Sequence, residues 1–249
     1  MTPEECFTEV TSLLPTLPYS RNFITSITFI PSVPGANDTP LLLPPSAPTS
    51  STHASKLEAL PHLHIVCRES HSESTAFTQV PVDGLGASGT LSGRGYFEPS
   101  TLGDDNGGSV HVLSDRVSSR AELVGLLTHE FVHAVDSSVH DLDLSTCAAL
   151  ACSEIRAAAA AECSLSLMPT TTSKYWPDWY RAMCVKNVAK SSTAMVFPQH
   201  GRACVDALFL PCSTLLPSES PVPTVAHVLR AETDAIEMAQ RRNESTRLS

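Results

Sequence analysis

Short runs of alternating or β-branched hydrophobic residues occupy the chain between residues 62 and 117. They read LHIVC, AFTQVPV, GRGYF and GGSVHVLSDRV, and breaks that contain glycine separate them. Alternation puts successive side chains on the two faces of a strand, and glycine favours the turns between strands. An earlier run, FITSITFIP, has the same alternation. The pattern predicts a small β-sheet.

Helical spacing replaces alternation after residue 118. Ser119 and Glu122 form the S-x-x-E sequence of a capping box, which satisfies the free amide donors at the start of a helix. The spacing predicts a helix of about four turns, which contains LLTHEFVHAVD at residues 126–136. The hydrophobic residues that recur at intervals of three and four are Leu123, Leu126, Leu127, Phe131, Ala134 and Val135.

A second helix is predicted from residue 145 to residue 163, STCAALACSEIRAAAAAEC, because alanine has the best helix propensity and no breaker interrupts the run. Residues 31–56 are rich in Pro, Ser and Thr and cannot bury enough apolar surface to order themselves. We therefore predict a poorly ordered N-terminal arm and linker over 1–60 and a folded domain over 61–215. A Pro-rich break and a C-terminal helix, VAHVLRAETDAIEMAQRR, are predicted within 216–249.

Charge and hydropathy exclude two classes of function. The 16 basic and 26 acidic residues give a formal net charge of −10, which repels a phosphate backbone, so we expect no nucleic acid partner. No window approaches the ~18 to 20 hydrophobic residues of a membrane-spanning helix. The N-terminal stretch MTPEECFTEVTSLLPTL has no basic region and resembles neither a secretory signal nor a transit peptide. Entry into an organelle would need another route.

The chain has eight cysteines, many for a reduced cytosolic protein of this size, and no C-x-x-C pair that suggests structural zinc. Disulfides are therefore predicted. Buried free thiols are the alternative, because cysteine also packs as a small apolar residue.

The segment LLTHEFVHAVD carries the clearest chemical signal. Residues four apart stack on one face of a helix, so His129 and His133 can both direct an imidazole nitrogen to one ion at about 2.0 to 2.1 Å. Glu130, beside His129, can take a proton from water. Composition alone gives about 0.02 expected matches to this H-E-x-x-H pattern. The alternative is an amphipathic helix with a solvated polar face, but polar residues on so apolar a segment would cost desolvation energy.

A catalytic zinc ion normally has three protein ligands and one open position. The metzincin pattern requires Gly at position 136 and His at position 139, where this chain has Asp136 and Val139. His140 is out of register by one residue. The spacing therefore excludes a metzincin site.

Glu154 is the candidate third ligand, 21 residues beyond His133 on the second predicted helix. The alternative is a surface glutamate or a partner of Arg156. Asp136 is interpreted either as an outer hydrogen-bond acceptor behind the ligands or as a residue of the helix end. The other histidines show no paired spacing except His62-x-His64 and are interpreted as ordinary polar residues.

The segments THEFVHAVD and DLDLSTCAALACSEIRAAAAAEC resemble a family of mitochondrial intermembrane-space metalloproteases that mature a membrane subunit of ATP synthase and help it assemble. That family reads approximately H-E-[LM]-[IV]-H-x-[YF]-D, then V-D-W, then A-C-[ST]-E-I-R-A, then a cysteine. The flanking segments and later cysteines extend the resemblance to roughly residues 65 to 212. The matching residues are His129, Glu130, His133, Asp136, Asp143, Cys152, Glu154, Arg156 and Cys163.

The chain also departs from the family pattern. The tryptophan after V-D is Leu144, and the paired histidines before A-C are Ala149 and Leu150. The early C-x-x-C keeps only Cys67, and the D-T-R-P-F-like segment near the C-terminus is missing. The paired histidines cannot be needed for metal binding here, and the disulfide pattern and the assembly role stay open.

The resemblance implies an α+β, zincin-like metallopeptidase in which a small sheet packs on an active-site helix and a second ligand-bearing helix. It implies a zinc endopeptidase in the mitochondrial intermembrane space, peripheral to the inner membrane. The substrate would be a protein or peptide such as the ATP synthase subunit precursor. The family reaches this oxidising compartment without a cleaved presequence, which fits the cysteines and the acidic N-terminus. Two alternatives are an assembly chaperone with dispensable protease activity and a zinc peptidase of another compartment.

The predicted mechanism uses zinc held by His129, His133 and Glu154 to polarise the scissile carbonyl and activate water, with Glu130 as general base. The strand over Val110–Leu113 precedes the active-site helix. We predict that this strand binds the substrate as an extended peptide by edge pairing.

Overall fold

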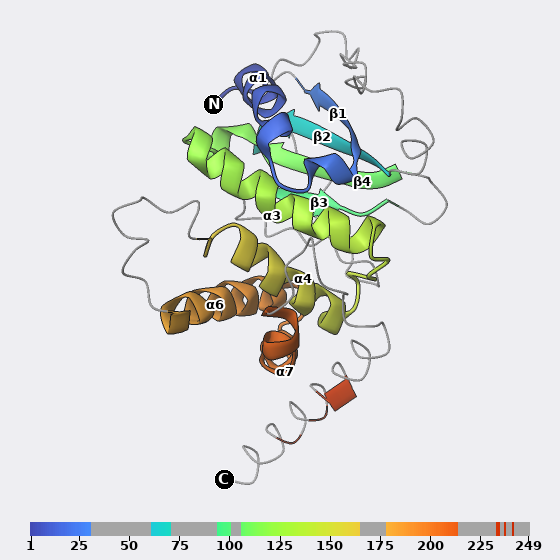
Figure 1. Cartoon of the computed structure of the whole chain (residues 1–249), viewed down its shortest axis with the longest axis vertical. Coiled ribbons are helices and arrows are strands. Elements are labelled where there is room, and N and C mark those ends of the chain that lie inside the picture. Colours follow the sequence, from blue (N-terminus) through green and yellow to red (C-terminus); the bar gives the residue numbers. More distant parts are fainter. Residues whose placement is uncertain are drawn as a thin grey trace. The chain divides into compact units, whose positions relative to one another are not determined.

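The computed structural model describes residues 1–30, 61–70, 94–100, 106–164 and 178–213, together with residues 233, 234, 237 and 241. Over these residues the fold is α+β, with one four-stranded mixed sheet and five α-helices (Figure 1). This confirms the predicted class. The predicted strand AFTQVPV lies outside the described residues, as does most of the predicted C-terminal helix.

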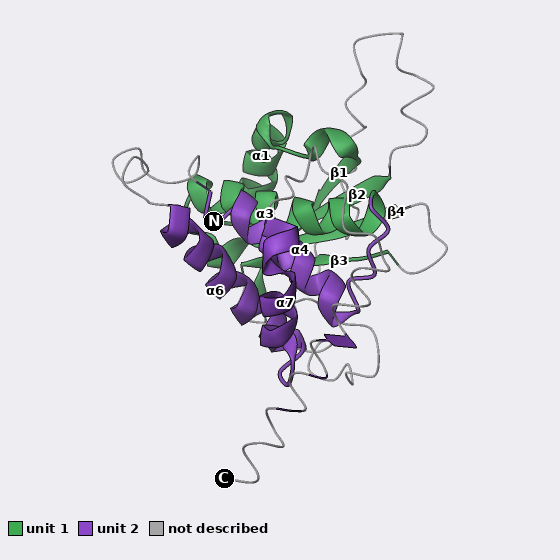
Figure 2. Ribbon diagram, turned by 60° about the horizontal axis from the view of Figure 1, so that its bottom comes forward, with its two compact units in different colours: residues 1–83, 88–139 green, residues 84–87, 140–249 purple. Residues whose placement is uncertain are grey.

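The chain forms two compact units. The first comprises Met1–Asp83 and Ser88–Val139, and the second comprises Gly84–Ala87 and His140–Ser249 (Figure 2). The sheet and the H-E-x-x-H helix belong to the first unit, and Glu154 belongs to the second.

The sheet of the first unit has the strand order β1-β2-β4-β3. Its strands are β1 (Ile24–Phe29), β2 (His62–Arg68), β4 (Asn106–Leu113) and β3 (Gly95–Glu98). The first three run parallel, and β3 pairs with β4 in antiparallel register. The alternating runs LHIVC and GGSVHVL lie within β2 and β4, and most of the earlier FITSITF forms β1, as their patterns predict. In the run GRGYF, the last three residues belong to β3.

The strand order contradicts the predicted peptide site on Val110–Leu113. β4 lies between β2 and β3, so its backbone groups on both sides are used within the sheet. An edge strand must have one free row of N–H and C=O groups to add a peptide. Among the described strands, β1 and β3 have that free row. The prediction was wrong because sequence position beside the helix does not specify position in the sheet.

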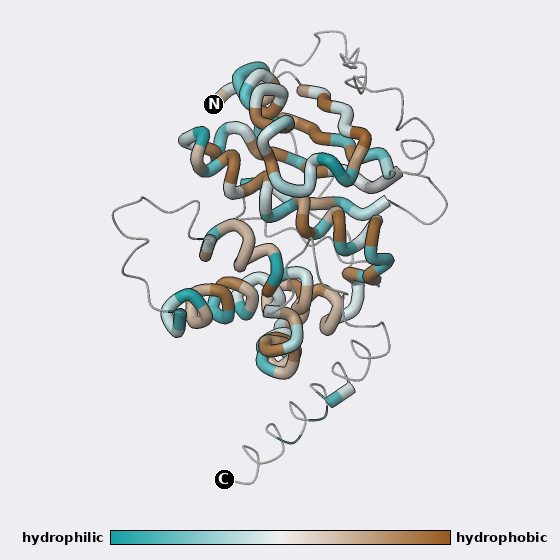
Figure 3. Tube along the Cα trace, in the orientation of Figure 1, coloured by the Kyte–Doolittle hydropathy of each residue, from teal (hydrophilic) through white to brown (hydrophobic). Residues whose placement is uncertain are grey.

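The core of the first unit lies between the sheet and α3 (Arg120–Ser138). Alternate residues of β2 and β4, including Ile65, Val110 and Val112, are fully buried, and so are Leu127 and Phe131 on α3. α3 packs on β3 and β4. Hydrophobic and polar residues alternate along α3 (Figure 3), which matches a helix with one face on a core.

The start of α3 differs in one detail from the predicted capping box. The Ser119 hydroxyl caps the helix by accepting a hydrogen bond from the Glu122 amide, at 3.2 Å. The Glu122 carboxylate, however, accepts from the amide and hydroxyl of Ser118, at 2.9 and 2.7 Å. In a complete capping box the Glu122 carboxylate would accept from the Ser119 amide, but here it accepts from Ser118, one residue earlier.

The N-terminal region corrects a second prediction. Residues 1–30 are not a poorly ordered arm, because Pro3–Leu13 form α1 and residues 24–29 form β1. The Thr2 hydroxyl accepts from the Glu5 amide, and the Glu5 carboxylate accepts from the Thr2 amide, which makes a complete capping box. A disulfide between Cys6 and Cys67 ties α1 to β2. The predicted Pro-rich linker, residues 31–56, lies outside the described residues.

The second unit is helical. α4 (Cys147–Ala160), α6 (Asp178–Val196) and α7 (Gly201–Ser213) pack on one another. The alanines of α4 are largely buried, so the neighbouring helices approach closely, as the small side chains predict. The sequence patterns did not predict α6 and α7, because α6 buries few residues (Val185, Ala189 and Thr193) and α7 contains a proline.

Disulfides cross-link this helical unit. Cys147–Cys204 and Cys152–Cys212 both join α4 to α7, and Cys163–Cys184 joins the segment after α4 to α6. With Cys6–Cys67, all eight cysteines are paired, which confirms the disulfide prediction. Over the described part of the chain, no helix is both long and apolar enough to span a membrane.

Candidate metal centre

α3 brings the two predicted histidine ligands together. The Nε2 atoms of His129 and His133 are 3.1 Å apart, and the ring centroids are 4.8 Å apart. Two nitrogens bound at about 2.0 to 2.1 Å to one tetrahedral ion would be separated by roughly 3.4 Å. The observed spacing is close to that value, so the pair fits a single metal ion with small side-chain adjustments.

Burial supports the same interpretation. His133 is only 3% exposed, and Glu130 beside it is 6% exposed. His129 is half-buried and so leaves one side of the pair open to solvent. The alternative of a solvated polar face is therefore wrong, since the polar residues of this helix lie largely inside the protein.

Asp136 lies in the last turn of α3, one turn after His133, with its side chain fully buried. A buried carboxylate requires polar or charged partners to offset its lost hydration. This location suits an outer hydrogen-bond acceptor better than a solvated helix end.

Glu154 lies in the middle of α4 and is 4% exposed. The surface-glutamate alternative is therefore excluded. Arg156 is also buried, but residues two apart on a helix point in different directions, which makes a direct pair along α4 unfavourable. Ala149 and Leu150, which replace the family's paired histidines, are buried in α4 and serve as ordinary core residues.

The other histidine pair considered in the sequence has a structural role. His64 Nε2 and Thr28 Oγ1 form a 3.1 Å hydrogen bond between β2 and β1, while His62 is exposed. Burial, and then the nearby charge of His111, lower the pKa of His64.

His111 stacks on the ring of Tyr96, and its Nε2 atom lies 3.1 Å from the Glu98 carboxylate. The hydrogen bond from His111 is the main cause that lowers the pKa of Glu98.

Comparison with protein families identifies the family of the chain. The model of the Peptidase M76 family matches residues 58–214, a stretch that covers more than half of the chain and contains both His129–Asp136 and Glu154. The chain belongs to the Peptidase M76 family. This is the mitochondrial metallopeptidase family whose motifs the sequence resembles, so the chain is related to proteases that use a metal.

The family match ends near the close of α7 and begins just before β2, so α1 and β1 lie outside it. No curated protein and no solved structure matches the chain. As a Peptidase M76 chain, it has a histidine pair and a buried glutamate on α3 that suit the chemistry of its family.

Proposed function

We propose that the protein is a zinc-dependent endopeptidase with a zincin-like fold. The observation that carries the proposal is the histidine pair on α3, with Nε2 atoms 3.1 Å apart and the buried Glu130 beside it. Imidazole suits zinc among the common divalent ions, and this helical spacing presents two imidazoles to one ion.

Glu154 is proposed as the third ligand. It is a buried carboxylate on a helix, and a carboxylate oxygen is a common zinc ligand beside two imidazoles. A His, His, Glu set leaves one coordination position open, as hydrolytic zinc sites require.

The proposed chemistry assigns a task to each residue. His129, His133 and Glu154 would hold the ion, which would supply the Lewis acidity that activates water and polarises the scissile carbonyl. Glu130 accepts a proton from the attacking water and donates it to the leaving amine. Asp136 acts behind the ligands as a hydrogen-bond acceptor that helps to orient them.

The outer edge of β3 is proposed to bind the substrate backbone. β3 packs on α3, the helix that carries the histidine pair, and its outer row of backbone groups is not used by β4. A peptide added there would be held mainly by backbone hydrogen bonds. N-methylation of alternate backbone amides in a peptide substrate should raise KM with little change in kcat. An unchanged KM for every N-methylated peptide would exclude this edge.

Zinc content tests the proposed site. We expect one zinc ion per chain in the wild type, none in His133→Ala and a clearly lower occupancy in Glu154→Ala. Glu162→Ala, which removes an exposed glutamate just after α4, is the matched control and should keep the ion. Full zinc retention in both His133→Ala and Glu154→Ala would overturn the site.

The cellular role is proposed from the family and from the disulfides. Four disulfides are typical of a protein that works in an oxidising compartment, and the intermembrane space of mitochondria, at the surface of the inner membrane, fits both. The proposed substrate is the precursor of an ATP synthase membrane subunit. Fractionation of a tagged chain tests the compartment, and recovery of the protein from another compartment would favour a peptidase with a different role.

A second candidate function is assembly of ATP synthase independent of proteolysis, which the family resemblance permits. Glu130→Gln should keep the zinc ion and lower kcat by about 100- to 10,000-fold, because it removes the general base. If this variant restores ATP synthase assembly in cells that lack the protein, the chaperone function dominates. If it fails, proteolysis is the required step.

A further inference from the structure

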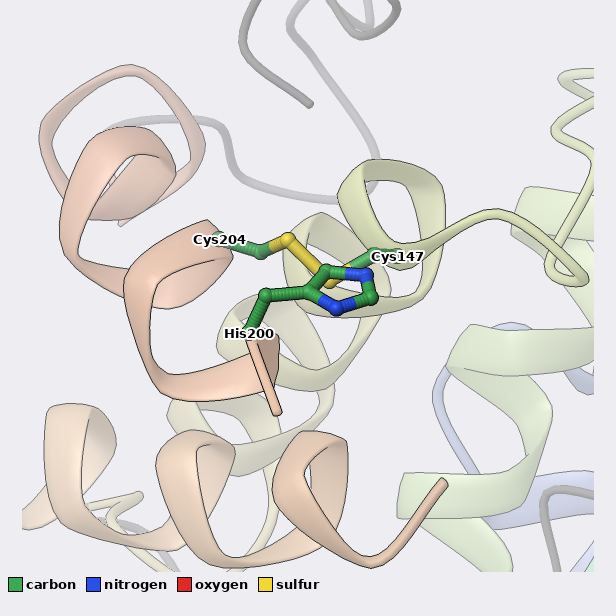
Figure 4. A group of neighbouring side chains, drawn as sticks. All are labelled: Cys147, His200 and Cys204. Atoms are coloured by element: carbon green, nitrogen blue, oxygen red, sulfur yellow. A yellow bond between two sulfur atoms is a disulfide. The ribbon is translucent and has the colours of Figure 1, made fainter. Parts of the chain in front are cut away.

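A second group of metal-binding side chains lies in the helical unit. Cys147, His200 and Cys204 each direct one donor atom toward the others, and these atoms all lie within 4.8 Å of one another. Figure 4 shows the imidazole of His200 beside the disulfide that joins the two cysteines. The group uses no residue of the proposed catalytic site.

The local backbone fixes these positions. Cys147 is the first residue of α4, directly after the capping residue Thr146. The His200 carbonyl accepts hydrogen bonds from the amides of Ala203 and Cys204, at 2.9 and 3.0 Å, so His200 stands at the start of α7. His200 and Cys204 are four residues apart across the first turn, which puts the imidazole and the sulfur on one side of the helix.

Both sulfur atoms sit in the first turn of a helix. The positive end of a helix dipole stabilises the negative charge of a thiolate. Stabilised thiolates favour the reduced form of a disulfide and are also the form that binds metal ions. The two cysteines are fully buried, whereas His200 is half-buried and lies on the solvent side of the group.

We propose that Cys147, His200 and Cys204 form a redox-controlled zinc site. A dithiol transfers two electrons and two protons to the Cys147–Cys204 disulfide, becomes a disulfide itself and leaves two thiols. Zn²⁺ then displaces the two thiol protons and binds both thiolates and a lone pair of the neutral His200 ring, with water in the fourth position. In the reverse step a disulfide of the surroundings accepts two electrons from the two thiolates and becomes a dithiol by taking up two protons, while Cys147–Cys204 re-forms and Zn²⁺ is released.

Distance and charge both suit the replacement of the disulfide by a bound zinc ion. Zn–S and Zn–N bonds of about 2.3 and 2.0 Å place tetrahedral ligand atoms roughly 3.3 to 3.8 Å apart. The donor atoms lie within 4.8 Å of one another, and the two sulfurs, bonded at 2.03 Å, need to separate by less than about 2 Å after reduction. Two thiolates and one divalent cation sum to zero charge. A neutral cluster is the form that a buried position tolerates best.

Another disulfide provides an internal comparison. Cys152–Cys212 joins the same two helices, α4 and α7, but among the described residues it belongs to no group that could hold a metal. It also keeps α4 and α7 connected when Cys147–Cys204 opens. The donor atoms of the proposed site would therefore stay close together after reduction.

Co²⁺ separates the two metal sites by spectroscopy. A cobalt ion bound by thiolates has a near-ultraviolet charge-transfer band, whereas a cobalt ion held by imidazole and carboxylate does not. We would titrate the full-length protein with Co²⁺, then displace it with Zn²⁺, at a series of dithiothreitol redox ratios. The oxidised protein should show no thiolate band, and the reduced protein should bind one further equivalent that produces it.

Matched variants identify the ligands. His200→Ala should weaken the additional zinc at least about tenfold, because loss of even an outer partner of a metal ligand costs 10- to 100-fold in affinity. Cys147→Ser/Cys204→Ser should abolish the thiolate band, and Cys152→Ala/Cys212→Ala should keep it. Loss of the catalytic zinc in His133→Ala should leave the band unchanged, so failure of one site is distinguishable from failure of the other.

Three results would overturn the proposal. The first is an unchanged thiolate band in Cys147→Ser/Cys204→Ser. The second is equal zinc affinity in His200→Ala and the wild type. The third is loss of helical circular dichroism on reduction even when Zn²⁺ is present, because an ion bound to α4 and α7 would hold these helices together.

Discussion

At the scale of single residues, the polar side chains buried on α3 mark the candidate functional site. Thr128, Glu130, His133 and Asp136 are all buried on a helix whose other buried residues are apolar. Thr128 has a structural explanation, since its hydroxyl donates to the Val124 carbonyl at 2.7 Å. The two carboxylates and the imidazole cost desolvation energy that a simple core helix would not require. The proposed metal ion and reacting water would account for their presence together.

Asp136→Asn tests the outer part of this site. The change keeps the size of the buried side chain and removes its negative charge, so zinc affinity should fall about 10- to 100-fold. Competition with a chelator of known affinity measures the zinc affinity of each protein. Asp178→Asn, at the exposed start of α6, is the control and should bind zinc as tightly as the wild type. Equal affinity in both variants would show that Asp136 has no role in metal binding.

At the scale of secondary structure elements, the site depends on the close approach of β3 to α3. A Cβ atom at Gly95 would lie 2.3 Å from the His111 carbonyl oxygen and 3.1 Å from the Leu126 side chain. The first contact is with the backbone of the neighbouring strand, which cannot move away easily. Glycine at this position is therefore required for β3 to pair with β4 beneath α3.

Gly95→Ala should lower the free energy of unfolding by about 1 to 3 kcal/mol, the range for an overpacked core. Gly125→Ala is the matched control, because a Cβ there meets no atom within 4 Å and alanine favours the helix. That control should raise stability by about 0.5 to 1 kcal/mol. Urea unfolding of both variants measures the effect. A free energy of unfolding for Gly95→Ala equal to that of the wild type would contradict the close packing.

The β1–β2 pair should make stability depend on pH through His64. Its pKa is lowered from 6.5 in the folded protein, mainly by burial, so the folded state binds fewer protons than the unfolded state as pH falls below about 6.5. The contribution is present above that pH and is lost as the pH falls toward the folded pKa. His64→Gln should flatten the decline in unfolding free energy between pH 7 and 5. His62→Gln, at the exposed start of the same strand, should follow the wild type, and identical slopes in all three proteins would rule out this role.

At the scale of the whole molecule, each unit is cross-linked by its own disulfides. One disulfide ties the N-terminal helix to the sheet, and three stabilise the helical unit. Each closes a loop of the chain and so restricts the unfolded state. This explains how a helix such as α6, with few buried residues, is retained in the fold.

Removal of the Cys6–Cys67 disulfide should destabilise the first unit. Its partners are 61 residues apart in the sequence, and a loop of this length contributes about 4 kcal/mol. Cys6→Ala/Cys67→Ala should therefore unfold at lower denaturant concentration, with its zinc content retained at low temperature. Cys163→Ala/Cys184→Ala, whose partners are 21 residues apart in the sequence, should lose less, about 3 kcal/mol. An unchanged midpoint in the first variant would show that α1 does not depend on its covalent link.

Local patterns in the sequence predicted many of the elements but not their arrangement. The strands around Ile65 and Val110 alternate, and α3 has clear helical spacing, so both are readable from neighbouring residues. α1 was missed although Thr2 and Glu5 make a complete capping box, a signal that the acidic start of the chain contains. His200 and Cys204 are four apart, like the histidines of α3, but their helix was not predicted and so the spacing was not recognised.

The sequence by itself determined the helix with His129, Glu130 and His133, because the geometry of that trio depends only on residues within one turn of one helix. Only the tertiary structure decided that β4 is central rather than an edge, that Glu154 is buried, and that His200 meets Cys147. These facts depend on contacts between distant segments, which leave no local pattern in the chain. Eight cysteines alone allow on the order of 100 pairings, and folding selects among them by bringing particular pairs together.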